Sequence, residues 1–322
     1  MADVKNYAIG REDIDAARER IAPHAHVTPV SRCATLDDLA GCQLFFKCEH
    51  LQKGGAFKFR GAVNAVLQLS EEEAQQGVIT HSSGNHAQAL ALAARIRGIK
   101  ATIVMPENGT PAKIEAVKGY GANVVLCTPT LQAREESVAR ILERSGGTFI
   151  HPYNHPHIMA GQGTTALELM EQVPGLDAVV VPVGGGGLLS GVCVAIRSEN
   201  PDIKVFAAEP KGADDVARSI AAGHLIPQTN PVTIADGLLT SMGPLTWPVI
   251  RDSVEEVLTV SEDEIISAMR LLWERAKLLV EPSAAVPFAA ILSGKQLQFQ
   301  ELKRVGVVLS GGNSNLDALP WL

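Results

Sequence analysis

The fold of this chain is decided by residues 179–191, which read Val-Val-Val-Pro-Val-Gly-Gly-Gly-Gly-Leu-Leu-Ser-Gly. The run before the glycines is apolar and mostly β-branched, which is typical of a strand buried on both faces. The residues after them open a helix, so the glycines connect a strand to a helix. Strand–loop–helix units of this kind build parallel sheets covered by helices, and we therefore expect an α/β fold.

The same alternation of short β-branched runs and longer amphipathic runs continues along the chain in both directions. We expect strands at Leu44–Cys48, Val78–His81, Ala101–Met105, Asn123–Cys127, Ala178–Pro182, Lys204–Glu209 and Arg304–Ser310. We expect helices at Asp13–Ala22, Lys58–Leu67, His86–Arg97, Pro111–Tyr120, Leu131–Arg144, Thr164–Val173, Leu188–Glu199, Asp214–Ala222, Ser261–Leu278 and Ser283–Leu292. Residues 78–127 alone contain three strand–helix units, which predicts a small sheet inserted in a larger architecture.

The four glycines Gly184, Gly185, Gly186 and Gly187 favour the binding of an anion. Their main-chain N–H groups can converge without obstruction by side chains, beside the positive end of a helix dipole. A dinucleotide site would need Gly-x-Gly-x-x-Gly and an acidic residue further on, and a P-loop would need Lys-Ser/Thr; neither pattern is present. We therefore expect a phosphate group here, with a plain flexible connection as the alternative.

A second glycine-marked stretch, Gly55-Ala56-Phe57-Lys58-Phe59-Arg60-Gly61-Ala62, holds a lysine between two aromatic residues. Burial beside Phe57 and Phe59 would lower the pKa of the Lys58 amine and favour its reaction with a carbonyl group. A surface lysine on the first turn of a helix is the alternative interpretation.

Two more segments place polar groups at the ends of expected strands. The hydroxyl, amide and main-chain N–H groups of Ser82-Ser83-Gly84-Asn85-His86 can hold a carboxylate, although capping of the helix by a serine would explain them too. Ser310-Gly311-Gly312-Asn313 puts a hydroxyl at the carboxyl end of the last strand, where α/β proteins bind ligands. A reactive lysine, a Ser/Asn loop and a phosphate-sized glycine loop together indicate pyridoxal phosphate (PLP).

The composition is that of an ordinary globular protein. Of 322 residues, 46% are hydrophobic and 20% are charged. The net charge of −7 argues against nucleic acid or an anionic membrane as a partner. We expect no signal peptide or membrane span, because no stretch approaches about 18 apolar residues. The five cysteines form no Cys-x-x-Cys pair, so we expect reduced thiols and a cytoplasmic location.

Several motifs in a fixed order resemble those of the fold-type-II PLP enzymes (tryptophan synthase β-like), in the serine/threonine dehydratase group. The chain is most similar to serine racemases and close to 3-hydroxyaspartate dehydratases. The matching segments are residues 44–49, 80–86, 160–164, 182–187, 234–237 and 310–313. The resemblance implies two three-layer domains with mainly parallel sheets. These are a large PLP-binding domain, residues 1–75 and 153–322, and a small, mobile domain, residues 76–152.

The resemblance also implies roles for individual residues. Lys58 would bond to PLP through its amine and then move the Cα proton of the substrate. Ser83 would be a second acid/base on the opposite face of the cofactor, which racemisation requires. Ser310 would face the ring nitrogen and leave it neutral, which favours prompt loss of a β-hydroxyl group. The complete set of matching cofactor positions is Lys58, Phe57, Asn85, Gly184, Gly185, Gly186, Gly187, Leu188 and Ser310, with Asn85 on the 3′-oxygen and the glycines on the phosphate.

Three further sets of residues match sites for substrate, cation and nucleotide. The substrate positions are Ser82, Ser83, Asn85, His86, Arg134 and Ser241. Among them, Arg134 would pair with the second carboxylate of 3-hydroxyaspartate. The metal positions are Glu209, Ala213 and Asp215, whose two carboxylates and main-chain carbonyl suit Mg²⁺ or Ca²⁺. Lys53, Gln88, Tyr120, Lys277 and Asn313 match part of an ATP effector pocket between the subunits of a homodimer, whereas Cys33, Ala34, Thr35 and Gly54 depart from it.

The predicted activity is PLP-dependent elimination of water and ammonia from a small β-hydroxy amino acid, which is serine, threonine or 3-hydroxyaspartate. Racemisation of serine is expected as a second activity. The alternative within the same fold is β-replacement of the cysteine synthase type. It is disfavoured because the Ser-Ser-Gly-Asn-His loop and the Glu209/Asp215 pair are features of the dehydratases. A third alternative is a PLP-binding protein without catalysis, which the retained Lys58 and Ser83 argue against.

Overall fold

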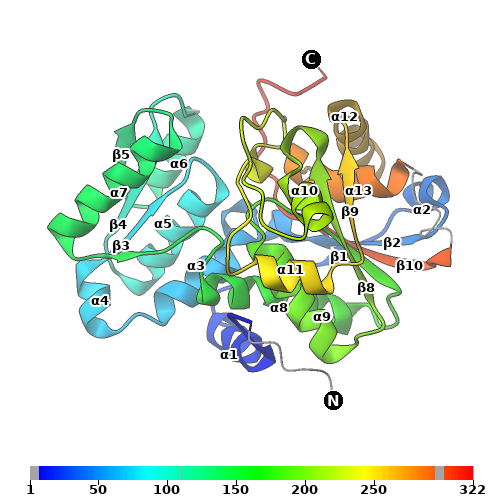
Figure 1. Cartoon of the computed structure of the whole chain (residues 1–322), viewed down its shortest axis with the longest axis horizontal. Coiled ribbons are helices and arrows are strands. Elements are labelled where there is room, and N and C mark those ends of the chain that lie inside the picture. Colours follow the sequence, from blue (N-terminus) through cyan, green and yellow to red (C-terminus); the bar gives the residue numbers. More distant parts are fainter. Residues whose placement is uncertain (1–6, 110, 294–300, 322) are drawn as a thin grey trace.

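The computed structural model describes residues 7–109, 111–293 and 301–321. Its two sheets lie in separate parts of the molecule (Figure 1). The larger sheet has the order β1-β2-β10-β7-β8-β9, formed by Val30–Ser31, Gln43–Cys48, Arg304–Leu309, Ala178–Pro182, Lys204–Pro210 and Glu256–Val260. The smaller sheet has the order β5-β4-β3-β6, formed by Asn123–Cys127, Ala101–Pro106, Val78–His81 and Thr148–Phe149.

Almost all neighbouring strands in the two sheets are parallel. Only β1, at the edge of the larger sheet, pairs antiparallel with its neighbour β2. The other pairs of the larger sheet are parallel, and so are the three pairs of the smaller one. The predicted α/β fold with mainly parallel sheets is therefore confirmed. Parallel strands bring their carboxyl ends to one edge, so the loops that follow β7 and β10 open on the same side.

Helices cover both faces of the larger sheet. Alternate residues of β2 show this arrangement, because Phe46 packs with Phe288 in one core cluster and Phe45 belongs to the other. The first cluster contains the helices α2 (Ala34–Ala40), α12 (Glu262–Leu271) and α13 (Pro282–Leu292). The second contains α1 (Arg11–Ile21), α8 (Pro156–Gln172), α9 (Gly187–Glu199), α10 (Asp215–Ala222) and α11 (Trp247–Ser253).

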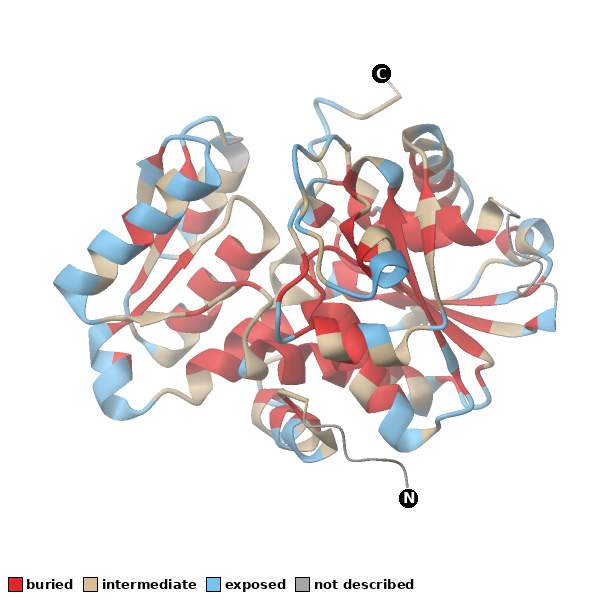
Figure 2. Ribbon diagram, in the orientation of Figure 1, coloured by how far each residue is buried: buried red, intermediate tan, exposed pale blue. Residues whose placement is uncertain are grey.

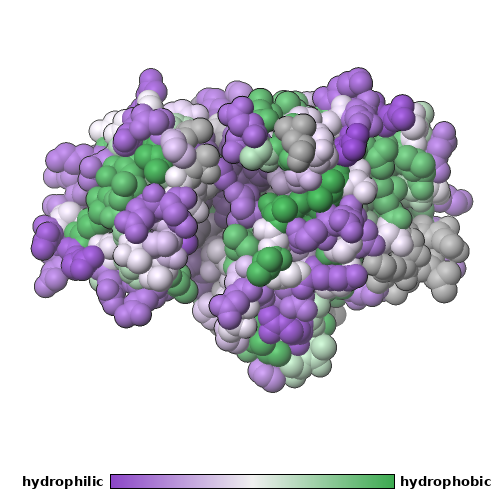
Figure 3. Space-filling view, turned by 90° about the horizontal axis from the view of Figure 1, so that it is seen from above, coloured by the Kyte–Doolittle hydropathy of each residue, from purple (hydrophilic) through white to green (hydrophobic). Residues whose placement is uncertain are grey.

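The smaller sheet has the same layered construction. One face packs on α3 (Lys58–Leu67), α5 (Asn85–Arg97) and α6 (Pro111–Gly119), and the other packs on α7 (Leu131–Ser145). α4 (Glu71–Gln76) precedes β3. β3 and β4 are mostly buried, whereas β5 is partly exposed and the outer turns of α7 are exposed (Figure 2). Seen from above, the surface is hollowed between the part built on the smaller sheet and the rest (Figure 3). No helix in the described ranges is long and apolar enough to cross a membrane.

The largest difference from the expected helices is at α8. The sequence predicts a helix over Thr164–Val173, but α8 already begins at Pro156. The added residues contain two glycines, which usually argue against a helix interior. Here they allow neighbouring segments to approach closely. If Gly161 were replaced by a residue with a side chain, its Cβ would lie only 2.6 Å from Gly61 Cα. Tertiary packing therefore overrides the local preference, and it draws α3 and α8 together.

The expected helix Ser261–Leu278 is also interrupted. Its α-helical part ends at Leu271 and continues as one π-helical segment, Leu272–Ala276. Lys277 then takes a left-handed conformation with φ 61°, which is uncommon for a residue other than glycine. The three short 3₁₀ segments that matter for the site are η2 (Lys53–Gly55), η3 (Lys211–Ala213) and η4 (Asp236–Leu238).

Candidate active site

Lys58 begins α3, and its amine is held at the junction of the two sheets. Its Nζ donates a hydrogen bond to the main-chain oxygen of Pro152 at 2.8 Å and lies 5.2 Å from the centre of the Phe57 ring. Burial lowers the pKa of Lys58 to about 8, and nearby Glu281 partly opposes this shift. The expectation of two flanking rings was wrong, because Phe59 is fully buried in the core and lies over Lys53 instead.

The glycine loop between β7 and α9 fits an anion. Gly186 has φ +87°, and α9 begins at the next residue. Among the described residues, no acceptor is found for the main-chain N–H groups of Gly184, Gly185 and Gly186. The ring of Tyr153 lies directly on the loop, since a Cβ at Gly185 would lie 2.3 Å from it. Free N–H groups beside a helix N-terminus, closed on one side by an aromatic ring, form a suitable cradle for a phosphate.

The loop after β3 leaves its second serine available. Gly84, not a serine, is the N-cap of α5, and it makes no side-chain capping bond. The Ser82 hydroxyl accepts a hydrogen bond from the Gly84 N–H at 3.3 Å. For the Ser83 hydroxyl the described residues offer no hydrogen-bond partner. The helix-capping interpretation of this loop is therefore wrong.

His86 follows directly and is buried. Its Nε2 lies 3.3 Å from the main-chain oxygen of Ile150, and its Nδ1 has no partner in the described part of the chain. Burial lowers the pKa of His86 well below the ordinary value, and the nearby Lys58 amine adds to this effect. A neutral His86 with a free ring nitrogen beside Lys58 can accept a hydrogen bond from a ligand.

Ser310 lies beside Lys58 because β10 ends next to the start of α3. The main-chain oxygen of Ser310 accepts a hydrogen bond from the Phe57 N–H at 3.0 Å, and Ala56 forms a β-bridge with Gly311. The Asn85 amide approaches from the other side, since a Cβ at Gly311 would lie 3.1 Å from Asn85 Nδ2. The structure thus brings together Lys58, Asn85 and Ser310, which the sequence predicts as neighbours of one cofactor.

Sequence reasoning missed two contributors to this site. Glu281, the N-cap residue of α13, is buried and accepts a hydrogen bond from Asn85 Nδ2 at 2.8 Å. Burial raises the pKa of Glu281 to about 7. The second contributor is the segment 151–154, which supplies the Pro152 oxygen to Lys58 and the Tyr153 ring to the glycine loop. A lone glutamate and a loop without glycines carry no signal that would find them in a sequence.

Glu209 and Asp215, two of the expected metal ligands, are both buried. Glu209 accepts hydrogen bonds from the N–H groups of Ala217 at 2.7 Å and Val216 at 3.3 Å. Asp215 Oδ2 accepts from the Met242 N–H at 2.9 Å, whereas its buried Oδ1 has no partner among the described residues. Burial raises the pKa of Glu209 to about 8 and that of Asp215 to about 6.

A free carboxylate oxygen in a buried acidic pair is a fitting ligand for a hard cation. Ala213, whose carbonyl is the third expected ligand, is buried at the end of η3. The described residues contain no group of three His, Cys, Asp or Glu side chains that could hold a metal. A cation here would therefore depend on the two carboxylates, main-chain oxygen and water.

Arg134 and Ser241 differ in how well they fit a substrate role. Arg134 is half-buried on the first turn of α7, and its buried Nε has no partner in the described ranges. Its charge lowers the pKa of His81, which directly precedes the serine loop, although burial is the larger cause. The Ser241 hydroxyl, in contrast, already accepts a hydrogen bond from the Gln228 N–H at 2.9 Å. Arg134 therefore keeps a free donor near the serine loop, whereas Ser241 is partly engaged.

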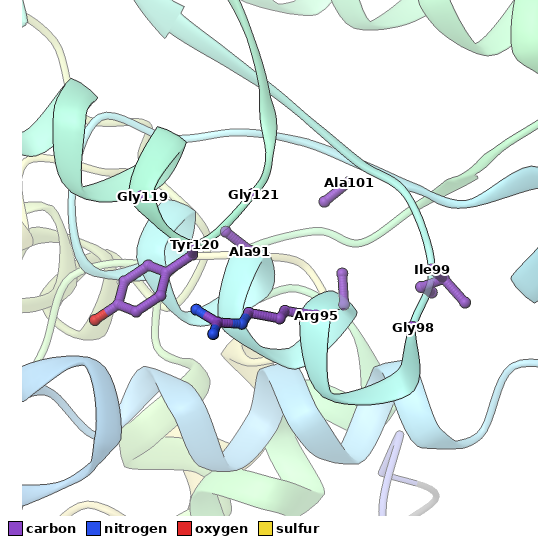
Figure 4. A pocket seen from close by; sticks show the side chains of 9 residues that line it. Ala91, Arg95, Gly98, Ile99, Ala101, Gly119, Tyr120 and Gly121 are labelled. Atoms are coloured by element: carbon purple, nitrogen blue, oxygen red, sulfur yellow. The ribbon is translucent and has the colours of Figure 1, made fainter.

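A surface pocket of about 460 Å³ lies on the part built on the smaller sheet (Figure 4). It is lined by the C-terminal half of α5, which carries Arg95, and by the turn after α6, which carries Tyr120. Of the five residues that match a nucleotide pocket, only Tyr120 lines it. Lys58 and the predicted cofactor residues do not line it, so this pocket is not the candidate active site.

Comparison with known proteins gives matches over most of the chain. Residues 21–311 match the family described as pyridoxal-phosphate dependent enzyme. A serine racemase of Dictyostelium discoideum is 50% identical over 310 residues, 96% of each chain. A beta-hydroxyaspartate dehydratase of Paracoccus denitrificans is also 50% identical over 310 residues, 96% of this chain and 98% of the relative. The structure of maize serine racemase superposes with a TM-score of 0.95 at 47% identity and covers 97% of this chain and 95% of that one.

Proposed function

The chain belongs to the family of pyridoxal-phosphate dependent enzymes, and we propose on this premise that it eliminates water and ammonia from a small β-hydroxy amino acid. Serine, threonine and 3-hydroxyaspartate are the candidate substrates, with racemisation of serine as a second activity. The observation that carries the proposal is the Lys58 amine, which has a lowered pKa and binds the Pro152 oxygen, next to Tyr153, whose ring lies on a glycine loop suited to phosphate.

The cofactor, when bound, withdraws electrons from the Cα atom of an attached amino acid and makes its proton acidic. Lys58 is placed to accept that proton, because an amine with a pKa of about 8 is partly unprotonated near neutral pH. The Pro152 oxygen, 2.8 Å from Nζ, orients the amine. Gly184–Gly187 and Leu188 would hold the phosphate, Phe57 would border the ring, Asn85 would donate to the 3′-oxygen and Ser310 would face the ring nitrogen.

Ser83 is the candidate for a second proton carrier. Its hydroxyl lies in the loop after β3 and has no partner among the described residues, so it is available to a substrate. Together with Ser82, Asn85 and His86, it would hold the substrate carboxylate. Proton delivery by Ser83 to the face that Lys58 does not serve would convert one enantiomer of serine into the other.

Arg134 bears on the choice of substrate. A 3-hydroxyaspartate carries a second carboxylate, and a carboxylate in a largely neutral pocket needs a cationic partner. The support is the buried, unpartnered Nε of Arg134 beside the serine loop. Ser241 would assist only if its hydroxyl donated to the ligand while still accepting from Gln228.

Replacement of Arg134 by alanine separates the two substrates. Loss of a charge-assisted hydrogen bond costs roughly 1.5–3 kcal/mol, so kcat/KM for 3-hydroxyaspartate should fall about ten- to hundredfold. Serine lacks the second carboxylate and should be affected much less. Equal losses on the two substrates would make Arg134 a structural residue.

The remaining expectations concern ions, assembly and motion. Glu209, Asp215 and the carbonyl of Ala213 would hold Mg²⁺ or Ca²⁺, supported by the unpartnered Asp215 Oδ1. A homodimer, a cytoplasmic location and movement of residues 76–152 as a small domain stay predictions. An ATP effector also stays a prediction, and Asn313, one of its five residues, makes hydrogen bonds inside the protein.

A panel of substrates tests the proposed reaction. The PLP-loaded protein should release a keto acid and ammonia from a hydroxy amino acid alone, measured with L-serine, L-threonine and 3-hydroxyaspartate. A β-replacement enzyme would release little keto acid until a nucleophilic co-substrate is added. Chiral analysis of the residual serine would detect racemisation. No keto acid from any of the three substrates would contradict the proposal.

A further inference from the structure

Asn85, Glu281 and Asn313 come from three distant parts of the chain and form a closed ring of hydrogen bonds. Asn85 Nδ2 donates to Glu281 Oε1 at 2.8 Å. The main-chain N–H of Asn313 donates to Glu281 Oε2 at 3.2 Å. The Asn313 side chain closes the ring, because its Nδ2 donates to Asn85 Oδ1 at 2.8 Å.

A count of donors and acceptors fixes the orientation of both amides. Asn313 Nδ2 carries two hydrogens, and its second bond is to the main-chain oxygen of Gly54 at 2.9 Å. Both hydrogens are therefore used, and the Asn313 amide cannot rotate by half a turn without losing them. Asn85 Oδ1 is occupied as an acceptor and Asn85 Nδ2 uses one hydrogen on Glu281. A single N–H of the Asn85 amide is left as a donor for a ligand.

Two glycines keep room for this ring. A Cβ at Gly55, which has φ +72°, would lie 2.5 Å from Asn313 Oδ1. A Cβ at Gly311 would lie 2.6 Å from Glu281 Oε1 and 3.1 Å from Asn85 Nδ2. Gly55 precedes Lys58 by three residues and Gly311 follows Ser310, so the ring packs against both cofactor segments. The glycines around Lys58 and Ser310 are thus explained by close approach of side chains.

The ring is also in electrostatic contact with the reactive amine. Glu281 is 4% exposed, and its charge opposes the lowering of the Lys58 pKa. Burial and the neighbouring Asp236 raise the pKa of Glu281 itself to about 7, whereas Lys113 and the Asn85 bond act in the opposite direction. A carboxylate held in this way accepts hydrogen bonds on both oxygens and keeps the Asn85 N–H groups directed as donors.

We propose that Asn313 is a positioning residue that, together with Glu281, orients the Asn85 amide so that its one free N–H is presented to the 3′-oxygen of PLP. The inference rests on the proposed function, which places that oxygen beside Asn85. A donor at this oxygen favours its unprotonated form, because a hydrogen bond to a charged group stabilises the charge. With PLP bound, a donor at this oxygen would leave the proton on the nitrogen that joins lysine and cofactor, which would keep that bond reactive.

Asn313→Asp tests this role, because an aspartate accepts hydrogen bonds and cannot donate them. The Asn85 oxygen then faces an acceptor instead of a donor, so the Asn85 amide is expected to shift and its free N–H to move out of line with the cofactor. The ratio of the visible to the near-ultraviolet absorption band of the PLP-loaded protein should fall across the pH range. The affinity for PLP should weaken about tenfold, as expected for one lost hydrogen bond. Asn315→Asp is the matched control, since the exposed Asn315 side chain accepts a hydrogen bond from the Asp317 N–H at 3.2 Å and is not part of the ring.

Asn313→Ser provides a second test if the Asn313→Asp variant does not fold. It removes the amide without adding charge, and it should change the band ratio in the same direction by a smaller amount. An unchanged band ratio and PLP affinity in the folded variant would overturn the inference, and so would a lower Tm with unchanged spectra. Failure of the proposed function looks different, because the wild-type protein itself would then show no visible band with PLP.

Discussion

Lys58 is half-buried and Lys47 is buried, and their partners decide which amine is available. The Lys47 side chain is fully buried, and its Nζ donates to the Thr28 oxygen at 2.7 Å, to Glu168 at 2.8 Å and to Gln172 at 2.9 Å. These bonds use the three hydrogens of an ammonium group. Lys58 has a single carbonyl partner, at Pro152. Burial lowers the pKa of both amines, but of the two only the Lys58 amine is left free to react.

Ser83→Ala should separate racemisation from elimination. The variant removes a hydroxyl that has no partner among the described residues, so the fold should be little affected. Racemisation of serine should be lost because it needs a proton carrier on each face, whereas elimination by way of Lys58 should continue. The measurement is consumption of L- and D-serine with chiral analysis, and Ser82→Ala, which should weaken substrate binding but retain racemisation, is the comparison. Unchanged interconversion in Ser83→Ala would assign the second proton transfer to another group.

At the scale of elements, residues 240–246 connect the acidic pair with the glycine loop. The Met242 N–H donates a hydrogen bond to Asp215 Oδ2. The next residue, Gly243, donates a hydrogen bond from its N–H to the main-chain oxygen of Gly185 at 3.2 Å. The Thr246 hydroxyl donates to the same oxygen at 2.9 Å. Hydrogen bonds of this segment thus link Asp215 to the loop expected to hold the phosphate.

Chelation of divalent cations should lower the Tm, more strongly at pH 8.5 than at pH 6. The pKa values of Glu209 and Asp215 are raised by burial to about 8 and about 6. Without a cation, the two protonated carboxyls contribute to the free energy of unfolding. This contribution is fully present below about pH 4, near the pKa values of the unfolded chain, and is lost as the pH rises through the raised pKa values of the folded protein. Thermal unfolding with EDTA, and with Mg²⁺ or Ca²⁺ restored, measures the effect.

Asp215→Asn is the matched variant for the chelation experiment. It keeps the shape of the side chain and removes its charge, so the response to EDTA should become small. A wild-type protein whose Tm ignores EDTA at both pH values would show that the acidic pair binds no cation and is only structural.

The sequence predicted the elements whose own residues carry the signal. The strands around β7 and the helix after the glycines are local patterns, and they are confirmed with small shifts in their ends. The early start of α8 was missed because Gly161 is explained only by Gly61, which is far away in sequence. Glu281 was missed for a similar reason: its role depends on Asn85 and Asn313, and a single glutamate before a helix has many ordinary explanations.

At the scale of the whole molecule, an ion pair joins the parts built on the two sheets. Lys113 Nζ on α6 donates to Asp236 on η4, next to the turn that packs against Gly184. The side chains of the pair are 21% and 53% exposed, so the pair contributes roughly 0.2–1 kcal/mol. If residues 76–152 move as a domain, this contact favours the arrangement with the two parts together.

Charge reversal tests the role of this ion pair. Lys113→Glu places two like charges across the junction and should raise KM a few-fold, with a smaller effect at high salt because exposed charges are screened. The double variant Lys113→Glu/Asp236→Lys should recover much of the loss. Lys118→Glu is the control, since Lys118 pairs with Glu115 within α6. If the control raises KM equally, or the double variant shows no recovery, the contact does not hold the two parts together.

The most direct test of the central claim is to identify the lysine that carries PLP. The loaded protein is reduced with borohydride, digested and mapped by mass spectrometry. The account predicts that the cofactor is fixed to Lys58, and that Lys58→Ala shows neither the visible band nor turnover, while Lys47→Met keeps the band if it folds. A cofactor fixed to Lys47 or to any other lysine in the wild-type protein would contradict the account.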